Sequence, residues 1–499
     1  MHNYFMRVRI VPLKTGKRAI QVVSKRWGKL IVHKHIGTIT TEDQKQVLLE
    51  KAREYIKFQT GQTELFTPPE YLQLKNVVIT QSQPLFLYHL LCRIYNHLGL
   101  DRCGDSLIRN LIVARIYQPQ SKRETREILS DSFGISYSLL TIYRHLKKAI
   151  GKNLKEQFQT ALIDFARKGL NDSLRLVFYD VTTLAFDSQT KAGLKDFGFS
   201  KDHRFTDVQI VVGLVVNRQG FPLYFDIFNG RTFEGKTFIS VIENIKSLLK
   251  NPELVVIADA AMINRINVEE LDKRNIGFIV GARLANLPVT LQNTISKAVS
   301  GIDQKTTTVD YLSHRLICQY LIKRAAKDRS EREKQTLKAN NIISSPSAIS
   351  RRFRFVKAVN GRYEVNTTLI EKAKKLEGIK GYLTNTDLEE NIIIKRYHDL
   401  WRIEKSFRIT KSDLEARPVF LRLDKTITCH LIIVFAGLAI CRFLEIQTNL
   451  SIQKILKIAQ KVLTHSVTNI QTGEKAFIET TILDEELKQK INLLNSLGH

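Results

Sequence analysis

The chain has 499 residues, of which 43% are hydrophobic and 25% charged, so several folded domains are expected and long disordered segments are not. Lys and Arg number 77 against 49 Asp and Glu, and this formal charge of +28 favours an acidic partner, most simply nucleic acid. The five cysteines are scattered without a C-x-x-C pair, which argues against a disulfide framework or zinc ribbon and favours a reducing cytoplasm.

The N-terminal 60 residues are expected to form a small β-meander followed by a helix. Residues 5–32 alternate apolar and polar side chains around turns at Gly16 and Gly28. A cap signal, Thr-Thr-Glu-Asp, opens a helix at about 41–58. The polar segment 59–84, with three prolines, is expected to be a linker.

Residues 61–170 are expected to be a largely helical DNA-binding region. Within them, a helix over 121–130, a glycine-containing turn over 131–137 and a basic helix over 138–150 suggest a helix-turn-helix. The second helix would present Tyr143, Arg144 and Lys147 to DNA. An ordinary helical hairpin is the alternative, because this spacing is weakly specific.

Residues 171–281 alternate strand and helix patterns. The expected order is strand, hairpin, strand, helix, strand, helix, strand, which is the order of a ribonuclease-H-like α/β core. Asp180 and Asp259 each follow a continuous apolar run of the kind found in buried parallel strands. Ligand sites form at the carboxyl ends of such strands, so these two acids are expected to meet there. A turn-capping role is the alternative for either one.

The remaining chain is expected to hold an insertion, a core helix and a C-terminal region. Residues 282–390 carry a basic segment and alternating strand patterns, which predicts a β-rich subdomain inserted in the core. Residues 391–412 are expected to form one core helix, and 413–499 a mostly helical region. The apolar run 427–441 is too short to span a bilayer and is expected to be a buried helix.

The core helix carries a third candidate acid. Tyr397, Glu404 and Lys411 are spaced by seven and seven, so on a continuous helix they share one face, with Arg408 one turn beyond Glu404. The alternative is an amphipathic helix whose Glu404 pairs with Arg408 in solvent. If Asp180, Asp259 and Glu404 converge, three carboxylates would suit Mg²⁺, with Mn²⁺ as a substitute, and could serve two-metal phosphoryl transfer.

Several ordered stretches resemble bacterial insertion-sequence transposases of the DDE type. They are Phe178–Leu184, Gly198–Arg204, Phe228–Phe238, Val256–Met262 and Tyr397–Lys411. The last is similar to the Tyr-x2-Arg-x3-Glu-x6-Lys box of a subgroup that also carries a β-rich insertion before the catalytic Glu. The chain departs from this box at one position, since Leu400 stands where the subgroup has Arg.

The resemblance implies a DNA transposase in which Asp180, Asp259 and Glu404 are catalytic and hold Mg²⁺. Tyr397 and Lys411 would position a phosphate, and Arg408 could replace the missing Arg. The DNA partners would be the terminal inverted repeats and target DNA, bound by a homodimer in the bacterial cytoplasm near the nucleoid, with no membrane partner. Two alternatives stay open: a metal-dependent nuclease of the same fold, and a DNA-binding regulator without chemistry.

Overall fold

The computed structural model describes residues 6–13, 17–26, 28–39, 42–60, 77–198, 207–262, 264–343, 353–359, 362–417, 421, 423–470 and 472–498. It divides into two compact units, which are taken in turn below. The first comprises Met1–Ile79 with Val467–Ala476, and the second comprises Thr80–Ser466 with Phe477–His499.

The first unit contains the predicted meander and helix. Strands β1 (Arg7–Pro12), β2 (Arg18–Arg26) and β3 (Lys29–Ile39) form an antiparallel sheet in chain order, and α1 (Glu42–Thr60) packs on it. Ile20 and Val22 of β2 and Ala52 of α1 are fully buried between them. Ala19 and Val23, on the other face of β2, are fully buried as well, so burial along this central strand does not follow a simple alternation.

The second unit begins with helices α2 (Leu85–His97), α3 (Ser106–Tyr117), α4 (Lys122–Phe133), α5 (Leu139–Gly151) and α6 (Leu154–Lys168). The predicted pair of helices is present as α4 and α5. Ser121 and Glu124 form a capping box at the start of α4, and Gly134, with φ 69°, ends it in a left-handed conformation. Ser138 then caps α5.

These helices pack around α14 (Asp424–Thr448), which contacts α2, α3, α5 and α6. By length and hydropathy α14 could cross a membrane, but 94% of its most apolar window is buried inside the protein. Its Cys429 and Cys441 are buried free thiols, as are Cys92 and Cys318. The predicted buried helix is therefore present, and it is longer than the apolar run that suggested it.

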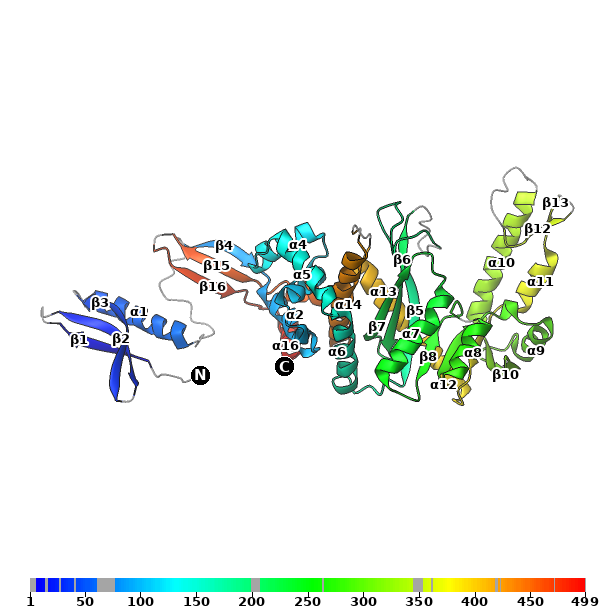
Figure 1. Cartoon of the computed structure of the whole chain (residues 1–499), viewed down its shortest axis with the longest axis horizontal. Helices are drawn as coiled ribbons and strands as arrows, with labels where there is room; N and C mark the ends of the chain where they lie inside the picture. The colour runs from blue at the N-terminus through cyan, green and yellow to red at the C-terminus, as the bar shows by residue number, and fades with distance from the viewer. Residues whose placement is uncertain are drawn as a thin grey trace. The chain divides into compact units, whose positions relative to one another are not determined.

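A mixed eight-stranded sheet forms the body of the unit, as expected for an α/β protein (Figure 1). Its order is β10 (Thr306–Tyr311), β11 (His314–Tyr320), β14 (Ile379–Thr384), β9 (Gly277–Ala282), β8 (Val255–Ala258), β5 (Leu176–Ala185), β6 (Gln209–Asn217) and β7 (Pro222–Asn229). β5, β8 and β9 are mutually parallel, and every other neighbouring pair is antiparallel.

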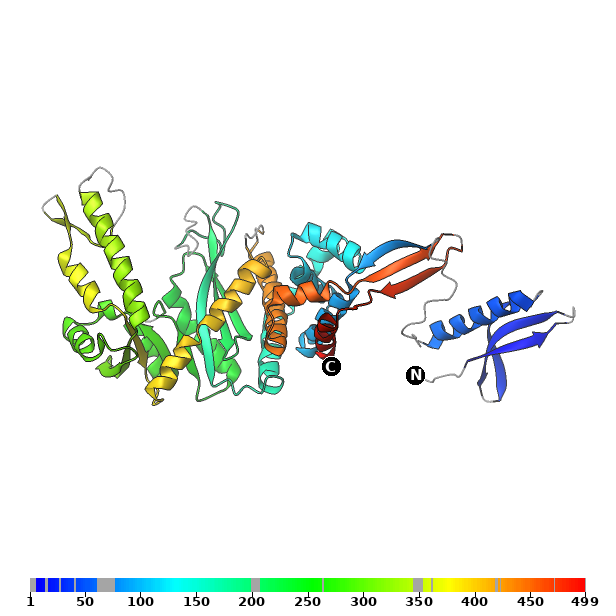
Figure 2. The ribbon, with the colours of Figure 1, turned by 180° about the vertical axis from the view of Figure 1, so that it is seen from behind.

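Helices cover both faces of this sheet. α7 (Glu234–Leu249) and α8 (Arg265–Lys273) lie in front of it in Figure 1. α13 (Trp401–Arg408) lies in front of it in the opposite view, Figure 2, and contacts β5 and β6. All nine residues of β6 are buried as a result.

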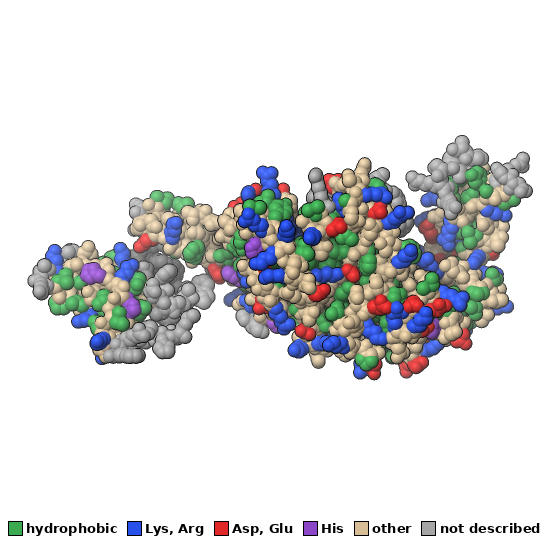
Figure 3. Space-filling model, viewed as in Figure 1, with side chains coloured by type: hydrophobic (Ala, Val, Ile, Leu, Met, Phe, Trp, Pro, Cys, Tyr) green, Lys and Arg blue, Asp and Glu red, His purple; other side chains and the backbone are tan. Residues whose placement is uncertain are grey.

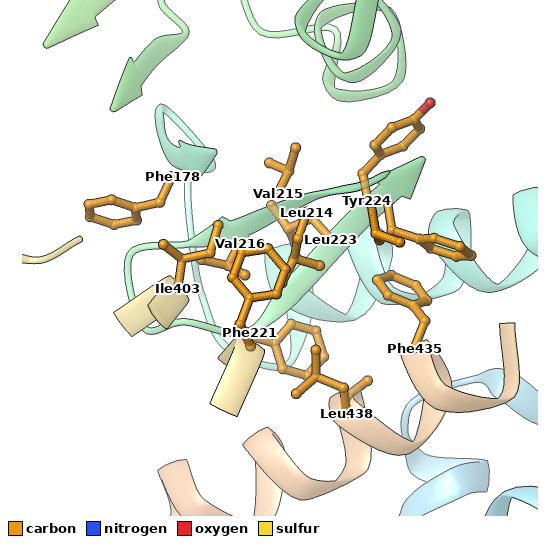
Figure 4. Close-up of a cluster of buried hydrophobic side chains, with 14 of the residues drawn as sticks. Phe178, Leu214, Val215, Val216, Phe221, Leu223, Tyr224, Ile403, Phe435 and Leu438 are labelled. Atoms are coloured by element: carbon orange, nitrogen blue, oxygen red, sulfur yellow. The ribbon is translucent and has the colours of Figure 1, made fainter. Parts of the chain in front are cut away.

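The core beneath α13 is built from long-range apolar contacts. Ile403 of α13 and Phe435 and Leu438 of α14 meet side chains of β6 and β7 (Figure 4). The rings of Phe225 and Phe435 are 4.7 Å apart between centroids. Burying such side chains contributes about 1.5–3 kcal/mol each, so this contact helps to fix α14 against β7.

Residues 282–390 differ from the predicted β-rich subdomain. Three of their strands, β10, β11 and β14, continue the central sheet instead of forming a separate one. The segment also holds α9 (Val289–Val299), α10 (Ile322–Ile343) and α11 (Thr367–Lys375), with a hairpin of β12 (Val356–Val359) and β13 (Arg362–Val365). An apolar alternation predicts a strand but does not say which strand it will pair with.

Two further segments differ from expectation. The predicted linker ends in β4 (Val77–Gln83), and the C-terminal region adds β15 (Thr464–Asn469) and β16 (Lys475–Glu479) to α15 (Ile452–Ala459) and α16 (Glu485–Ser496). These strands form a sheet in the order β16-β15-β4. The Thr80 hydroxyl donates to the Ser466 carbonyl at 3.0 Å across 386 positions, a separation that local patterns do not reveal.

Candidate active site

The parallel register of β5 and β8 makes Asp180 and Asp259 lateral neighbours. The paired positions end at Tyr179 and Ala258, and each aspartate is the next residue along the chain, Asp180 within β5 and Asp259 directly after β8. Adjacent strands lie about 4.8 Å apart, and side chains at equivalent positions point to the same face. The expectation that Asp180 ends its strand is wrong, because β5 continues to Ala185 through antiparallel pairing with β6. At Asp180, β5 stops pairing with β8 but goes on pairing with β6.

The helix predicted over 391–412 is broken. α12 (Glu390–His398) and α13 are joined by a tight turn in which the Leu400 amide donates to the Tyr397 carbonyl, and α13 ends in a π-helical turn, Ile409–Asp413. A π turn bonds i to i+5, so it shifts the register of everything after it. The seven-residue spacing therefore does not keep Tyr397, Glu404 and Lys411 on one stripe.

A cleft of about 430 Å³ at the carboxyl ends of β8 and β9, beside the middle of β5, brings the three candidate acids together. Asp180, Asp259 and Glu404 all line it, and Tyr397 lines it too. Lys411 does not line this cleft. Arg408 lies in an adjoining shallow pocket with Trp401, Glu404 and Lys405.

Tyr397 is attached directly to one of the acids. Its phenol donates a hydrogen bond to Oδ1 of Asp259 at 3.1 Å, and its ring packs edge-on against Tyr382. Burial and the nearby charge of Asp259 raise the pKa of Tyr397 above its usual value, so the phenol stays a donor. The structure thus places Tyr397 against a carboxylate, where the sequence suggested a contact with phosphate.

Gly281 of β9 makes room for this contact. A Cβ atom added at Gly281 would collide with the Tyr397 hydroxyl and lie 3.2 Å from Cβ of Ala260. The hydroxyl therefore occupies the space that a side chain would take. Glycine at this position is required by the close approach of the tyrosine rather than by backbone conformation.

Two cations that the sequence analysis did not select also line the cleft. They are Lys380 on β14 and Arg324 on α10. The Lys380 ammonium lies 4.6 Å from the centroid of the Tyr397 ring. Burial, and then Arg324, lowers the pKa of Lys380, while the charges of Asp259 and Glu404 act to raise it. Arg324 belonged to the basic segment assigned to the insertion. Lys380 lies in β14, a strand that the sequence analysis did not locate, and it had no signal of its own.

A buried ionic network holds α13, and with it Glu404, in place. Arg442 of α14 pairs with Glu445 at 2.6 Å and donates to the Gly220 carbonyl in the β6–β7 turn at 3.0 Å. Lys405 reaches the same Glu445 at 2.8 Å, and Ser406 donates to the same Gly220 carbonyl at 3.0 Å. Both charges of the central pair are satisfied by several partners, which is the condition under which buried ions are tolerated.

The donor chemistry of the cleft fits a hard divalent cation, since three carboxylates line a cavity that also has room for water. Oδ1 of Asp180 accepts from the Val181 amide and Oδ1 of Asp259 from the Ala260 amide, both at 2.7 Å, so one oxygen of each is oriented by backbone. Across the described residues, no three His, Cys, Asp or Glu side chains are grouped closely enough to form a complete coordination set. A bound ion would thus require the carboxylates of the cleft to lie closer together.

The other predicted DNA-contacting residues lie away from this cleft's lining. Tyr143, Arg144 and Lys147 are all exposed on α5. Positions 143, 144 and 147 fall on one side of a helix, as the prediction requires. His203 and Arg204, which belong to the stretch 198–204, lie outside the described residues. In the face shown in Figure 3, Lys and Arg side chains are spread widely rather than gathered in one patch.

Comparison with known proteins gives one strong match. The family model of the transposase DDE domain matches residues 172–440, more than half of the chain, and the match includes all three candidate acids. No curated protein matches the chain.

Similarity to solved structures is weak. A piggyBac transposase synaptic complex with hairpin DNA is 8% identical, covering 83% of this chain and 85% of that chain, with a TM-score of 0.41. The Mos1 transposase paired-end complex with the left transposon end is 13% identical, covering 48% and 67%, with a TM-score of 0.16. Likeness at these TM-scores assigns neither the fold nor the activity.

Proposed function

The chain belongs to the transposase DDE domain family, and we propose that it is a DNA transposase of the bacterial insertion-sequence type. It would cut the ends of its element and join them to target DNA by metal-dependent phosphoryl transfer. One observation carries this proposal: Asp180 and Asp259 occupy adjacent register positions on parallel strands, and Glu404, 145 positions after Asp259, lines the same cleft.

We propose that β5 to β9 form a ribonuclease-H-like core. Their order across the sheet is β7-β6-β5-β8-β9, with the hairpin strands antiparallel and the last two strands parallel to β5. This topology supports the core predicted from the element order. The chain between β9 and α12 then interrupts the core and returns to it through β14.

We propose that Asp180, Asp259 and Glu404 hold Mg²⁺, with Mn²⁺ as a substitute. When bound, such ions lower the pKa of water and stabilise the charge on a phosphate's oxygens. Tyr397 would keep Asp259 oriented through its hydrogen bond. Lys380 and Arg324 would offset the three negative charges before an ion binds and face a phosphate afterwards.

The same two cations would compensate for Leu400. Leu400 lines the cleft, and Arg402 is turned to Asp399 at 3.2 Å and lies against the Trp401 ring, so it does not replace the missing Arg. Arg408 borders Glu404 from the adjoining pocket. Cleft-lining cations on β14 and α10 therefore supply the charge that the family box places on the core helix.

For DNA binding, we propose that α5 presents Tyr143, Arg144 and Lys147 to the element's ends, and that Arg408 and Lys411 contact DNA near the cleft. A homodimer bound to two ends would complete the assembly.

The test is a cleavage and joining assay on DNA carrying the terminal inverted repeats, with Mg²⁺ present or chelated. The parent should cut and join only with Mg²⁺, and Asp259→Asn should do neither.

The matched control is Asp187→Asn, which removes an exposed aspartate just beyond β5 and should leave activity at the parental level. Cutting without any joined product would assign the chain to a nuclease activity instead. Tight end binding without Mg²⁺-dependent cutting by the parent would contradict the enzymatic proposal altogether.

A further inference from the structure

A second pocket, of about 300 Å³, lies at the start of α4 and gathers basic side chains from three helices. Arg115 comes from α3, Lys122 and Arg123 from α4, and His430 from α14. Arg417, between the π-helical turn and α14, lines it as well. The residues that line the active-site cleft are entirely different, so the two sites are separate.

The basic groups in this pocket are unusually buried. Lys122 is 8% exposed, Arg115 7% and His430 6%. Lysine and arginine are almost never buried to this degree unless they are paired with an acid. A buried charge without compensation costs several kcal/mol, so a cluster of this kind needs an explanation.

Protein partners account for only part of this charge. Arg115 donates to the Gln120 carbonyl at 2.8 Å, and His430 contacts the Ala416 carbonyl at 3.3 Å. For the ammonium of Lys122, the described residues provide neither an ion pair nor a hydrogen bond. Of the two acids that line the pocket, Glu124 is engaged in the capping box of α4 and Glu415 is exposed.

The titration behaviour agrees with this shortage of negative charge. Burial, and next the charge of Arg115, lowers the pKa of Lys122 to about 7. Burial also lowers the pKa of Arg115 to about 10, while the charge of Glu415 acts to raise it. A doubly or singly charged oxyanion placed among these groups would reverse the effect of burial.

Backbone geometry adds a second attraction for an anion. α4 has 12 residues, and its first turn lies at the pocket, where the helix presents the positive end of its dipole and amides that lack a helical partner, of which that of Glu124 is capped by Ser121. Such a terminus alone is common. Here it coincides with Lys122, a side chain more than nine-tenths buried that lines the same space and whose ammonium has no partner among the described residues.

We propose that this pocket is a phosphate-binding site and that its occupant is one backbone phosphate of the element's end DNA. The proposal rests on the transposase function above and adds a specific contact to it. Tyr143 lines the pocket and is also one of the exposed α5 residues predicted to face DNA, so a strand lying along α5 passes the mouth of the pocket. The buried Lys122 would then hold the phosphate that fixes the register of α5 on the duplex.

The key variant is Lys122→Met, which keeps the aliphatic stem and removes the charge. Because it relieves an uncompensated buried cation, the variant should fold with a Tm equal to or above the parental value. Lys168→Met is the matched control, since Lys168 is an exposed lysine at the end of α6 that lines neither pocket.

The first measurement is a methylphosphonate scan, in which single phosphates of the end DNA are made neutral one at a time. With the parent, neutralising the phosphate that enters the pocket should weaken binding about tenfold, as expected for a charge-assisted hydrogen bond. With Lys122→Met, the natural DNA should already bind about tenfold more weakly, and neutralising that one phosphate should cost nothing further. Lys168→Met should give the parental scan.

The second measurement uses inorganic phosphate as a probe, without DNA. Phosphate should raise the Tm of the parent and of Lys168→Met but not that of Lys122→Met. If phosphate does so while no scanned position loses its effect in Lys122→Met, the pocket binds a small anion and the DNA assignment is overturned.

The two proposals fail in different ways. If the parent binds and cuts end DNA but Lys122→Met leaves the methylphosphonate scan unchanged, the proposal for the pocket is overturned and the transposase function stands. A parent that neither binds nor cuts end DNA overturns the transposase function, and the DNA occupant of the pocket with it, whatever inorganic phosphate does.

Discussion

The hydroxyl of Tyr397 donates a hydrogen bond to Oδ1 of Asp259 across 138 positions of the chain, at 3.1 Å. It links α12 to the carboxyl end of β8, and so ties the turn before Glu404 to the strand that carries the second acid. A tyrosine in this place orients the carboxylate of Asp259.

Tyr397→Phe removes this hydrogen bond and keeps the ring. Asp259 would then be free to rotate, and outer partners of this kind typically change metal affinity by about 10–100-fold. We expect the Mg²⁺ concentration for half-maximal cutting to rise within that range, with end-DNA affinity unchanged. Tyr363→Phe, an exposed tyrosine of β13, is the control. An unaltered Mg²⁺ requirement would show that the bond does not position Asp259.

Gly281→Ala places a methyl group where the Tyr397 hydroxyl lies. The tyrosine must move away from Asp259, so cutting should fall at least as far as in Tyr397→Phe. The double variant Gly281→Ala/Tyr397→Phe loses the hydroxyl that collides, and it should be no worse than Tyr397→Phe alone. Such coupling is measured by a double-mutant cycle on the cutting rate. Additive losses would mean that the glycine acts on something else.

Glu404→Gln keeps the volume of the side chain and removes the charge. We expect loss of Mg²⁺-dependent cutting by at least about 100-fold, while end-DNA binding stays at the parental level or tightens at low metal as carboxylate repulsion is relieved. Paired gel-shift and cutting assays across Mg²⁺ concentrations measure both. Glu479→Gln, on exposed β16, should match the parent. Parental cutting by Glu404→Gln would direct attention to Asp413 and Glu415.

Lys380→Met tests the cation that the sequence analysis missed. Its ammonium faces the cleft and Lys411 does not line it, so Lys380→Met should reduce cutting more than Lys411→Ala does. Each should reduce the salt dependence of DNA binding by no more than about one phosphate contact. The ranking of the two cutting rates is the readout. A larger loss in Lys411→Ala would restore the phosphate-positioning role to the core helix.

Lys122→Met should change how stability depends on pH. The folded-state pKa of Lys122 is lowered to about 7, below an unfolded value of about 10.4, so its destabilisation is complete below pH 7 and disappears above pH 10.4. The parent should therefore gain stability between these limits, and Lys122→Met should exceed it most at pH 6. Urea unfolding at pH 6, 8 and 10 measures this, with Lys168→Met as control. An equal offset at every pH would contradict it.

Two of the other groups around Lys122 have pKa values that burial lowers, Arg115 and His430. The pKa of Arg115 on α3 is about 10, at the upper end of the window, so the comparison of pH 6 with pH 8 reports on Lys122. His430 on α14 is held neutral by burial first and then by Arg115 and Lys122, and Arg417 and Tyr143 also line the pocket. The remaining groups that face it or act on it are Arg123, Glu124, Glu415 and Cys429.

The sequence by itself determined the local elements and selected the three candidate acids. Strand and helix patterns from β5 to β9 depend on side-chain periodicity and on turn residues such as those before Gly220, so they could be located within a few residues. The family box and the spacing of Asp180, Asp259 and Glu404 are also properties of the chain alone. None of these requires knowledge of what packs against what.

Tertiary structure decided which elements and side chains contact one another. The break between α12 and α13, the π-helical turn that carries Lys411 and the placement of Lys380 in the cleft depend on which strand β14 joins and on how α14 anchors α13. The pocket around Lys122 depends on burial by α3, α4 and α14, and α14 lies far from the other two in the sequence. Pairing and burial are set by contacts hundreds of residues apart, where free energy comes from removing surface from water rather than from local periodicity.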